Sequence, residues 1–309
     1  GNSPERVHPL GPDYPLRRRH VTAPHTPLDE DPHIHERRWM ILGVMAASLT
    51  LVVMSVSGLN VALPTIQESL EASNSALQWI IDSYALVFAG LLLMAGALGD
   101  RFGRRNALLV GLSIFATGAA VGGLAASAVQ VIAGRVVMGA GAAFVMPATL
   151  SLVTTVFPPD ERRRAIAVWA GFAGAGAAIG PIVSGTLLEA FWWGSALLVN
   201  IPIVILLMIA IAMLAPHSRD PHNTPLDPAG TVLSLIGITA LVFAIIEGPN
   251  LGWTNPGVLI GFGVAALTLV GFVARQRSAA HPMLPLELFG DLRFAVGSAV
   301  ITVTFVAMI

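Results

Sequence analysis

Residues 96–105 read GALGDRFGRR, a short charged stretch between two long apolar runs. The runs at 83–98 and 107–131 contain no charged residue. With 77–82 added to the first, both have the length and polarity of helices that cross a bilayer. Arginines beside the end of a membrane-spanning segment favour the cytoplasmic face. The stretch is therefore predicted to be a cytoplasmic loop between two transmembrane helices.

The glycines of this loop have a structural role that is separate from the role of its charged residues in orientation. A glycine lets two helix ends approach closely and tolerates the positive φ of a tight turn. The pattern G-x-L-x-D-R-x-G-R-R resembles the signature between the second and third helices of the major facilitator superfamily. A charged turn of another polytopic protein would explain the arginines but not the spacing of the glycines and the aspartate. The residues that carry the pattern are Gly96, Gly99, Asp100, Arg101, Gly103, Arg104 and Arg105.

The composition is that of an integral membrane protein. The chain of 309 residues is 55% hydrophobic and 11% charged, whereas soluble domains average about 25% charged residues. Its mean hydropathy is +0.75. Cysteine is absent, which excludes disulfides, thiolate metal sites and cysteine nucleophiles.

The apolar segments predict an all-α membrane protein in which every span is a helix. All the arginines of the alternate loops fall on one side, and of the 17 only Arg135 lies inside a span. This asymmetry predicts a cytoplasmic N-terminus. All 17 basic residues are arginine, which suggests a GC-rich bacterial source, and we expect the bacterial inner membrane as the location. A ninth apolar run, 294–309, would reach about 24 Å as a helix against a hydrocarbon core of about 30 Å, so we expect the chain to be part of a longer protein. The eight complete spans are predicted at 39–63, 77–98, 106–126, 129–153, 165–189, 195–215, 229–247 and 256–274.

Four parts follow from this pattern. Residues 1–38 are expected to form a disordered cytoplasmic tail, because they are rich in proline and histidine and lack apolar periodicity. Residues 39–215 should form a six-helix transporter half, and 216–274 a short loop with two additional membrane helices. Residues 275–309 should hold a cytoplasmic loop and the truncated start of a second half. No histidine spacing in the tail fixes a metal geometry, and no cofactor is expected.

Ionisable side chains at membrane depth indicate function, because their burial is costly without a partner or water. Asp82 lies near the outer end of the second span and Arg135 lies early in the fourth. The segment around Arg135 resembles the superfamily motif R-x-x-x-G-x-G, and this resemblance implies a part in the proton coupling of antiporters. We predict that both residues serve proton or substrate coupling. The alternatives are that Arg135 snorkels to the cytoplasmic interface or ties helices together, and that Asp82 is exposed near the outer surface.

The fifth span carries a glycine and proline pattern suited to close packing. Gly176 and Gly180 lie on one helix face, and Pro181 withdraws a backbone donor and permits a bend. With Gly185 these residues resemble the antiporter motif of the superfamily, G-x-x-x-G-P followed by a further glycine. We expect the four residues to let a neighbouring helix approach.

The end of the first span, at Asn60, is similar to that of the fourteen-helix drug:proton antiporter family of the superfamily. That family commonly has an acidic residue five positions earlier, where this chain has Ser55. Either Asp82 carries the proton or the coupling differs. The short loop at 215–228 and the two helices after it agree with the fourteen-helix branch.

Other polar and aromatic residues at membrane depth have weaker signals. Asn60, Trp79 and Tyr84 are candidates for the lining of a cavity. Glu189 and Glu247 close the fifth and seventh spans, and we expect them to be solvated helix ends at the outer face.

The resemblance implies an alternating-access exporter that expels a small lipophilic or cationic compound while protons enter. In that scheme Asp100 and the loop arginines hold a cytoplasmic gate. The expected partners are the substrate, protons and the lipid bilayer, and not nucleic acid. An enzyme is not expected, because the spans hold no histidine and no phosphate-binding loop follows a strand. The alternatives are a non-transporting or partner-dependent membrane protein, such as a remnant, scaffold or sensor, and an exporter of a metabolite.

Overall fold

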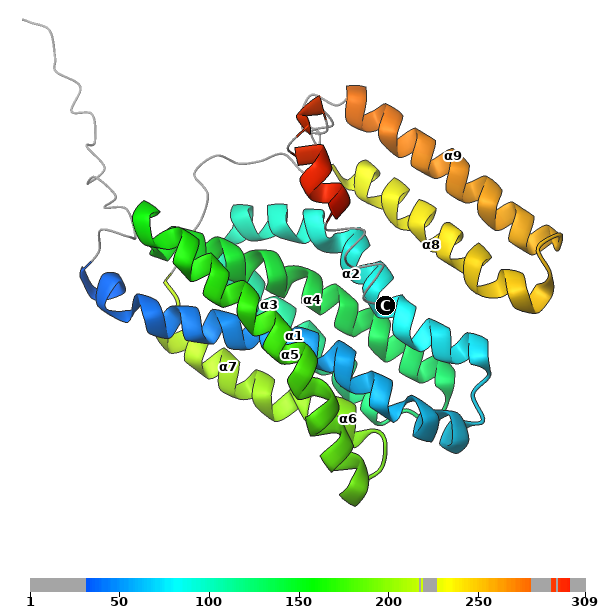
Figure 1. Ribbon diagram of the computed structural model, residues 1–309, viewed down its shortest axis with the longest axis horizontal. Helices are drawn as coiled ribbons and strands as arrows, with labels where there is room; N and C mark the ends of the chain where they lie inside the picture. Colours follow the sequence, from blue (N-terminus) through cyan, green and yellow to red (C-terminus); the bar gives the residue numbers. More distant parts are fainter. Residues whose placement is uncertain (1–31, 217, 219–226, 279–289, 293, 301–309) are drawn as a thin grey trace, which may run out of the picture.

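The computed structural model describes residues 32–216, 218, 227–278, 290–292 and 294–300, and within these ranges it contains helices and no strand. Eight segments are long and apolar enough to cross a membrane, with α6 and α7 together forming one of them, Ser195–Leu214. This confirms the predicted all-α fold and the eight predicted spans (Figure 1). The helices are α1 (Pro32–Leu70), α2 (Asn74–Phe102), α3 (Arg104–Gly123), α4 (Ala128–Val156), α5 (Pro159–Ala190), α6 (Ser195–Leu198), α7 (Asn200–Leu214), α8 (Pro228–Leu251) and α9 (Pro256–Ser278).

The junction of α2 and α3 shows why residues 96–105 are rich in glycine. Only Gly103 separates the two helices, and its φ is 109°, a conformation that strains any residue with a side chain. A Cβ built on Gly99 would lie 3.2 Å from the Cβ of Ala107, so the two helix ends are in contact at the turn. The predicted tight turn between the second and third spans is confirmed.

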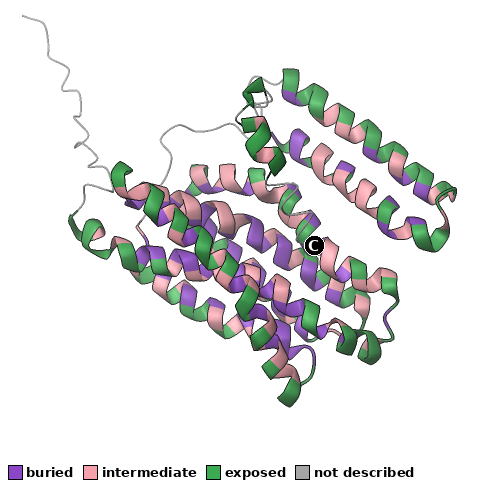
Figure 2. Cartoon of the chain, viewed as in Figure 1, coloured by how far each residue is buried: buried purple, intermediate pink, exposed green. Residues whose placement is uncertain are grey.

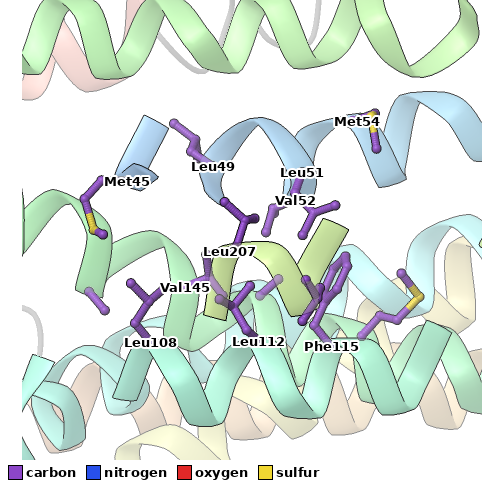
Figure 3. Close-up of a cluster of buried hydrophobic side chains, with 14 of the residues drawn as sticks. Met45, Leu49, Leu51, Val52, Met54, Leu108, Leu112, Phe115, Val145 and Leu207 are labelled. Carbon is purple, nitrogen blue, oxygen red and sulfur yellow. The ribbon is translucent and has the colours of Figure 1, made fainter. Parts of the chain in front are cut away.

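Helices α1 to α7 pack around a shared apolar core. Helix α1 packs mainly on α5, and both α2 and α3 pack on α4. Figure 3 shows Met45 and Leu49 of α1 near Leu108 and Leu112 of α3, with Leu207 of α7 beside them. Figure 2 shows that the outward helix faces are exposed although they are apolar. Such faces suit contact with lipid chains, which are as apolar as leucine.

Helices α8 and α9 form a hairpin beside α2 (Figure 1). At its start, Asp227 caps α8 by accepting the backbone N–H of Gly230 at 3.0 Å. The same carboxylate accepts the Nε–H of Arg275 at 2.8 Å and the Nε2–H of Gln276 at 3.2 Å, both from the last turn of α9. Because the Asp227 side chain is only 4% exposed, this cluster closes one end of the hairpin.

Asp227→Asn is expected to loosen the hairpin. Burial alone would raise the pKa of Asp227, but the hydrogen bonds from Gly230 and Arg275 outweigh it and hold that pKa below its ordinary value. The stabilisation is therefore complete above the unfolded pKa of about 3.9 and is lost as pH falls through the folded pKa. We expect a loss of about 1–2 kcal/mol near neutral pH, since the hydrogen bonds to a charged group are weakened and Arg275 is half in solvent.

The measurement is the thermal unfolding midpoint of the purified protein between pH 6 and pH 3. The unfolding midpoint of the variant should be lower at pH 6 and should fall less on acidification than that of the wild type. Arg277→Gln is the matched control, because Arg277 is exposed in the same last turn of α9 and should leave both values unchanged. Parallel pH curves for Asp227→Asn and wild type would contradict the assignment.

At the two ends of the chain, the structure differs from the predicted domain boundaries or does not describe the residues concerned. Helix α1 begins at Pro32, so the predicted tail of residues 1–38 is wrong for its last seven residues, and 1–31 lie outside the described residues. The early start has a physical reason, because Arg38 forms an ion pair with Glu161 of α5 at 2.9 Å. Residues 294–300 are helical, as expected for the start of the ninth run. The rest of that run is not described.

Candidate functional site

Asp100 and Arg104 form an ion pair at the end of the bundle that also carries Arg162, called here the arginine-rich end. The Nε–H of Arg104 donates to Asp100 Oδ1 at 2.8 Å. The same guanidinium donates to Thr155 Oγ1 of α4 and to Ser218 Oγ, the latter at 3.3 Å. The backbone N–H of Arg104 also donates to the carbonyl of Ser218 at 3.0 Å. One arginine thus joins α2, α3, α4 and the segment that follows α7.

A cavity of about 300 Å³ opens beside this ion pair. Asp100 lines it with a side chain that is 35% exposed, and Ser151 Oγ donates to Asp100 Oδ1 at 3.5 Å. Because most of the other lining side chains are small or apolar, Asp100 is the acidic feature of the cavity. The lining residues come from the ends of α2 and α4 and from Arg104: Ala95, Gly96, Gly99, Asp100, Arg104, Pro147, Ala148, Leu150, Ser151 and Thr154.

The other two arginines of the predicted gate do not share this network. Arg105 donates from Nη2 to the carbonyl of Ala212 in α7 at 2.6 Å. Arg101 is exposed, and its guanidinium lies over the ring of Phe102 at 5.5 Å. The structure therefore separates a half-buried connecting pair, Asp100 and Arg104, from flanking arginines. The loop motif alone could not make that distinction.

Arg135 is buried between α4 and α2, with 1% of its surface exposed. Its Nε–H donates to the carbonyl of Ile80 at 3.1 Å, and its guanidinium carbon lies 4.2 Å from the ring centre of Tyr84. One turn further along α4, a Cβ built on Gly139 would lie 2.5 Å from the carbonyl oxygen of Tyr84. The R-x-x-x-G spacing therefore matches two successive turns of α2. The alternative that Arg135 snorkels to the cytoplasmic interface is wrong, and the alternative that it ties helices together agrees with this contact.

Asp82 and Arg135, both of which are predicted to serve proton or substrate coupling, lie on different sides of α2. Ile80 and Tyr84 are four residues apart and face Arg135, whereas Asp82 lies halfway between them, about 200° around the helix. Asp82 instead shares the helix face of Trp79, which points to α8. The half-buried Asp82 thus belongs to the interface with the additional helices.

Trp79 contacts α8 and does not line the described cavity. Its Nε1–H donates to Glu247 Oε1 at 3.1 Å, and Ser75 Oγ donates to Glu247 Oε2 at 3.3 Å. The ring of Trp79 lies 6.4 Å from that of Phe243. The prediction that Glu247 is a solvated helix end is therefore wrong, because it is bound between two helices. No sequence pattern signals this contact, since it depends on where α8 docks.

The remaining cavity candidates lie elsewhere. Asn60 is exposed on α1, and Tyr84 is 3% exposed beneath Arg135. Neither lines the cavity described above. Glu189 is exposed at the end of α5, as expected for a solvated helix end.

The glycines of the α5 pattern differ in whether they contact α1. Cβ atoms built on Gly176 and Gly180 would lie 2.8 Å from the carbonyl oxygen of Thr50 and 2.6 Å from that of Met54, both in α1. These two glycines therefore allow the close crossing of α1 and α5. Gly185 differs from the expectation, since a Cβ there meets nothing within 4 Å. Helix α5 continues through Pro181 without interruption.

The fold and these motif positions can be set against known proteins. Residues 45–309 match the family model described as Major Facilitator Superfamily. The chain belongs to this superfamily. Its members are transporters, so the prediction that the chain is not an enzyme is confirmed. Eight helices able to span a membrane make it a multi-pass membrane protein.

Several superfamily relatives are named for drug efflux or resistance. The chain is 40% identical over 259 residues to the multidrug efflux pump LfrA of Mycolicibacterium smegmatis, covering 84% of this chain and 51% of the relative. It is 35% identical to the multidrug resistance protein Stp of Mycobacterium tuberculosis, with 88% and 51% covered. It is 35% identical to the methylenomycin A resistance protein of Bacillus subtilis, with 82% and 55% covered. The chain thus spans about half the length of the relatives it matches.

A solved transporter structure supports the fold alone. The POT family transporter PepTSo superposes with a TM-score of 0.56 at 19% sequence identity, covering 76% of this chain and 52% of that one. The helix arrangement of this chain is therefore that of a known transporter.

Proposed function

We propose that the chain is the first part of a proton-coupled exporter of lipophilic drugs, cations among them, that works by alternating access. The observation that carries the proposal is the 40% identity to a multidrug efflux pump, over residues that include the Asp100–Arg104 pair. The arginine-rich end would face the cytoplasm of a bacterial inner membrane, with the N-terminus on that side.

In this proposal the Asp100–Arg104 pair acts as part of a gate. Arg104 holds α2, α3, α4 and Ser218 together through hydrogen bonds that a movement of any one element would break. Asp100 faces an open cavity and can accept a further donor from another part of the transporter. A partly exposed ion pair of this kind can exchange partners with little change in free energy. This property suits a contact that forms in one conformation of the transporter and breaks in the other.

Proton coupling in this proposal involves Asp82. Its carboxyl group is half-buried at the α2–α8 interface, and within the described residues it makes no hydrogen bond or ion pair. A carboxyl group at membrane depth can gain and lose a proton more cheaply than it can hold a permanent charge. Protonation would remove the charge of this carboxyl group on the side of α2 where the additional helices meet the six-helix part.

The test uses purified protein in proteoliposomes with ethidium as the lipophilic cation and a pH-sensitive dye inside. An imposed pH gradient should drive ethidium movement together with counter-movement of protons, and a protonophore should abolish both. Asp82→Asn should reduce gradient-driven movement about tenfold, as expected for loss of about 1.4 kcal/mol of coupling. Glu189→Gln, an exposed acid on α5, is the control and should behave as wild type.

Two results would count against the proposal in different ways. If ethidium moves without counter-movement of protons, the proposed proton coupling is wrong, and the protein is an uncoupled exporter or a channel-like carrier. Full coupling in Asp82→Asn would show that another group carries the proton.

A further inference from the structure

The positive charge of Arg135 has no counter-charge among the described residues. It is the largest fully buried side chain, and its Nη1 and Nη2 atoms have no hydrogen-bond partner there. The Ile80 carbonyl satisfies only Nε, and the Tyr84 ring covers one face of the guanidinium. Water could satisfy the free donors but would not neutralise the charge. A buried and unpaired charge in a membrane is expensive, so an anionic partner would stabilise it.

Four described acids in or beside the spans are placed away from Arg135. Asp100 is paired with Arg104, and Glu247 is bound by Trp79. Asp82 lies on the other side of α2, and Glu189 is exposed at the end of α5. None of these carboxylates forms an ion pair with Arg135.

Further donors lie on the same face of α2 as the contact with Arg135. Ile80, Ser83 and Tyr84 are three and four residues apart, which places them together on a helix. Ser83 Oγ and Tyr84 Oη are buried and have no hydrogen-bond partner in the described part of the chain. The two free nitrogens of a guanidinium form a planar fork that fits both oxygens of a carboxylate. The unmet donors therefore fit one small oxyanion better than they fit a neutral group.

We propose that Arg135, with Tyr84, forms a binding site for the carboxylate of a transported compound, so that the substrates include lipophilic acids and zwitterions. This inference rests on the proposed transport function, because a transported compound would supply the carboxylate for Arg135, which is 1% exposed here. The apolar surroundings on α2 and α4 would accept the lipophilic body of such a compound, while Arg135 fixes its acidic end.

Binding is tested on the purified protein without transport, using benzoate and its neutral analogue benzamide. A ligand that binds the folded state raises the unfolding midpoint, and at ten times its Kd we expect a rise of about 2–4 °C for benzoate. Benzamide should give no rise, since it lacks the charge. Sodium chloride at the same ionic strength controls for a general effect of salt.

Variants separate this site from other anion contacts. Arg135→Gln should abolish the benzoate shift, Tyr84→Phe should reduce it, and Arg163→Gln, which removes an exposed arginine of α5, should retain it in full. Equal shifts with benzoate and benzamide, no shift with benzoate, or a full shift in Arg135→Gln would each overturn the proposal. If Arg135→Gln does not fold, the wild-type comparison and Tyr84→Phe still decide. A benzoate shift in a protein that moves no ethidium would keep the site and reject the exporter.

Discussion

Gly180→Ala is expected to separate α1 from α5 and to lower stability more than any other single methyl group added to α5. A Cβ at this position would lie 2.6 Å from the carbonyl oxygen of Met54 and 2.8 Å from the amide nitrogen of Gly58. Both are backbone atoms, so they cannot turn away as a side chain would. Overpacking of this kind typically costs about 1–3 kcal/mol, and in this crossing the upper end is expected. The measurements are the unfolding midpoint of the purified protein and its amount in the membrane.

Gly174→Ala is the matched control on the same helix. A Cβ at Gly174 meets nothing within 4 Å, and alanine has the higher helix propensity. This variant should therefore match the wild type within about 0.5 kcal/mol. An equal loss in both variants would mean that the backbone of α5 is sensitive to alanine in general, and that the crossing with α1 is not the cause.

Asp100→Asn is expected to reduce efflux about tenfold while the protein inserts and folds normally. Asparagine keeps the shape of the side chain but removes the charge that holds Arg104 at 2.8 Å. A charge-assisted hydrogen bond is worth roughly twice a neutral one, and about 1.4 kcal/mol corresponds to a factor of ten. The readout is ethidium efflux from energised cells at equal protein level in the membrane.

Asp160→Asn provides the control for loss of a carboxylate at the same end of the bundle. Asp160 is exposed in the first turn of α5, and efflux should be unchanged. If efflux falls equally in both variants, the effect comes from the net charge of this membrane face. If efflux stays normal in Asp100→Asn, the ion pair has no part in the gate.

The sequence was sufficient for the spans and for the turn at Gly103, because both depend on local properties. An apolar run of membrane length has few alternatives to a helix, and a single residue between two helices must tolerate a positive φ. Arg135 stands out in the sequence for a similar reason, since it is the arginine that interrupts a span, but the sequence leaves its burial open. The different sides occupied by Asp82 and Arg135 follow only once the structure shows that Ile80 and Tyr84 face Arg135, since Asp82 falls halfway between those two residues.

What the sequence could not provide depends on how separate helices dock. From the sequence, Glu247 is expected to be a solvated helix end, and only the packing of α8 against Trp79 shows otherwise. Ser218 and Thr155 carry no motif, yet both accept hydrogen bonds from Arg104. Gly176 and Gly185 look alike in the sequence, and only the position of α1 shows that the first is in contact and the second is not. Tertiary contacts of this kind leave no periodic signal in a single chain.

The contact between α8 and α2 determines which body the hairpin moves with. Glu247 binds Trp79, and nearer the other membrane face a Cβ on Gly90 would lie 2.5 Å from Leu235 of α8. Two attachments so far apart prevent α8 from pivoting on α2. In a transporter whose two halves rock, the α8–α9 pair would therefore move together with the first half.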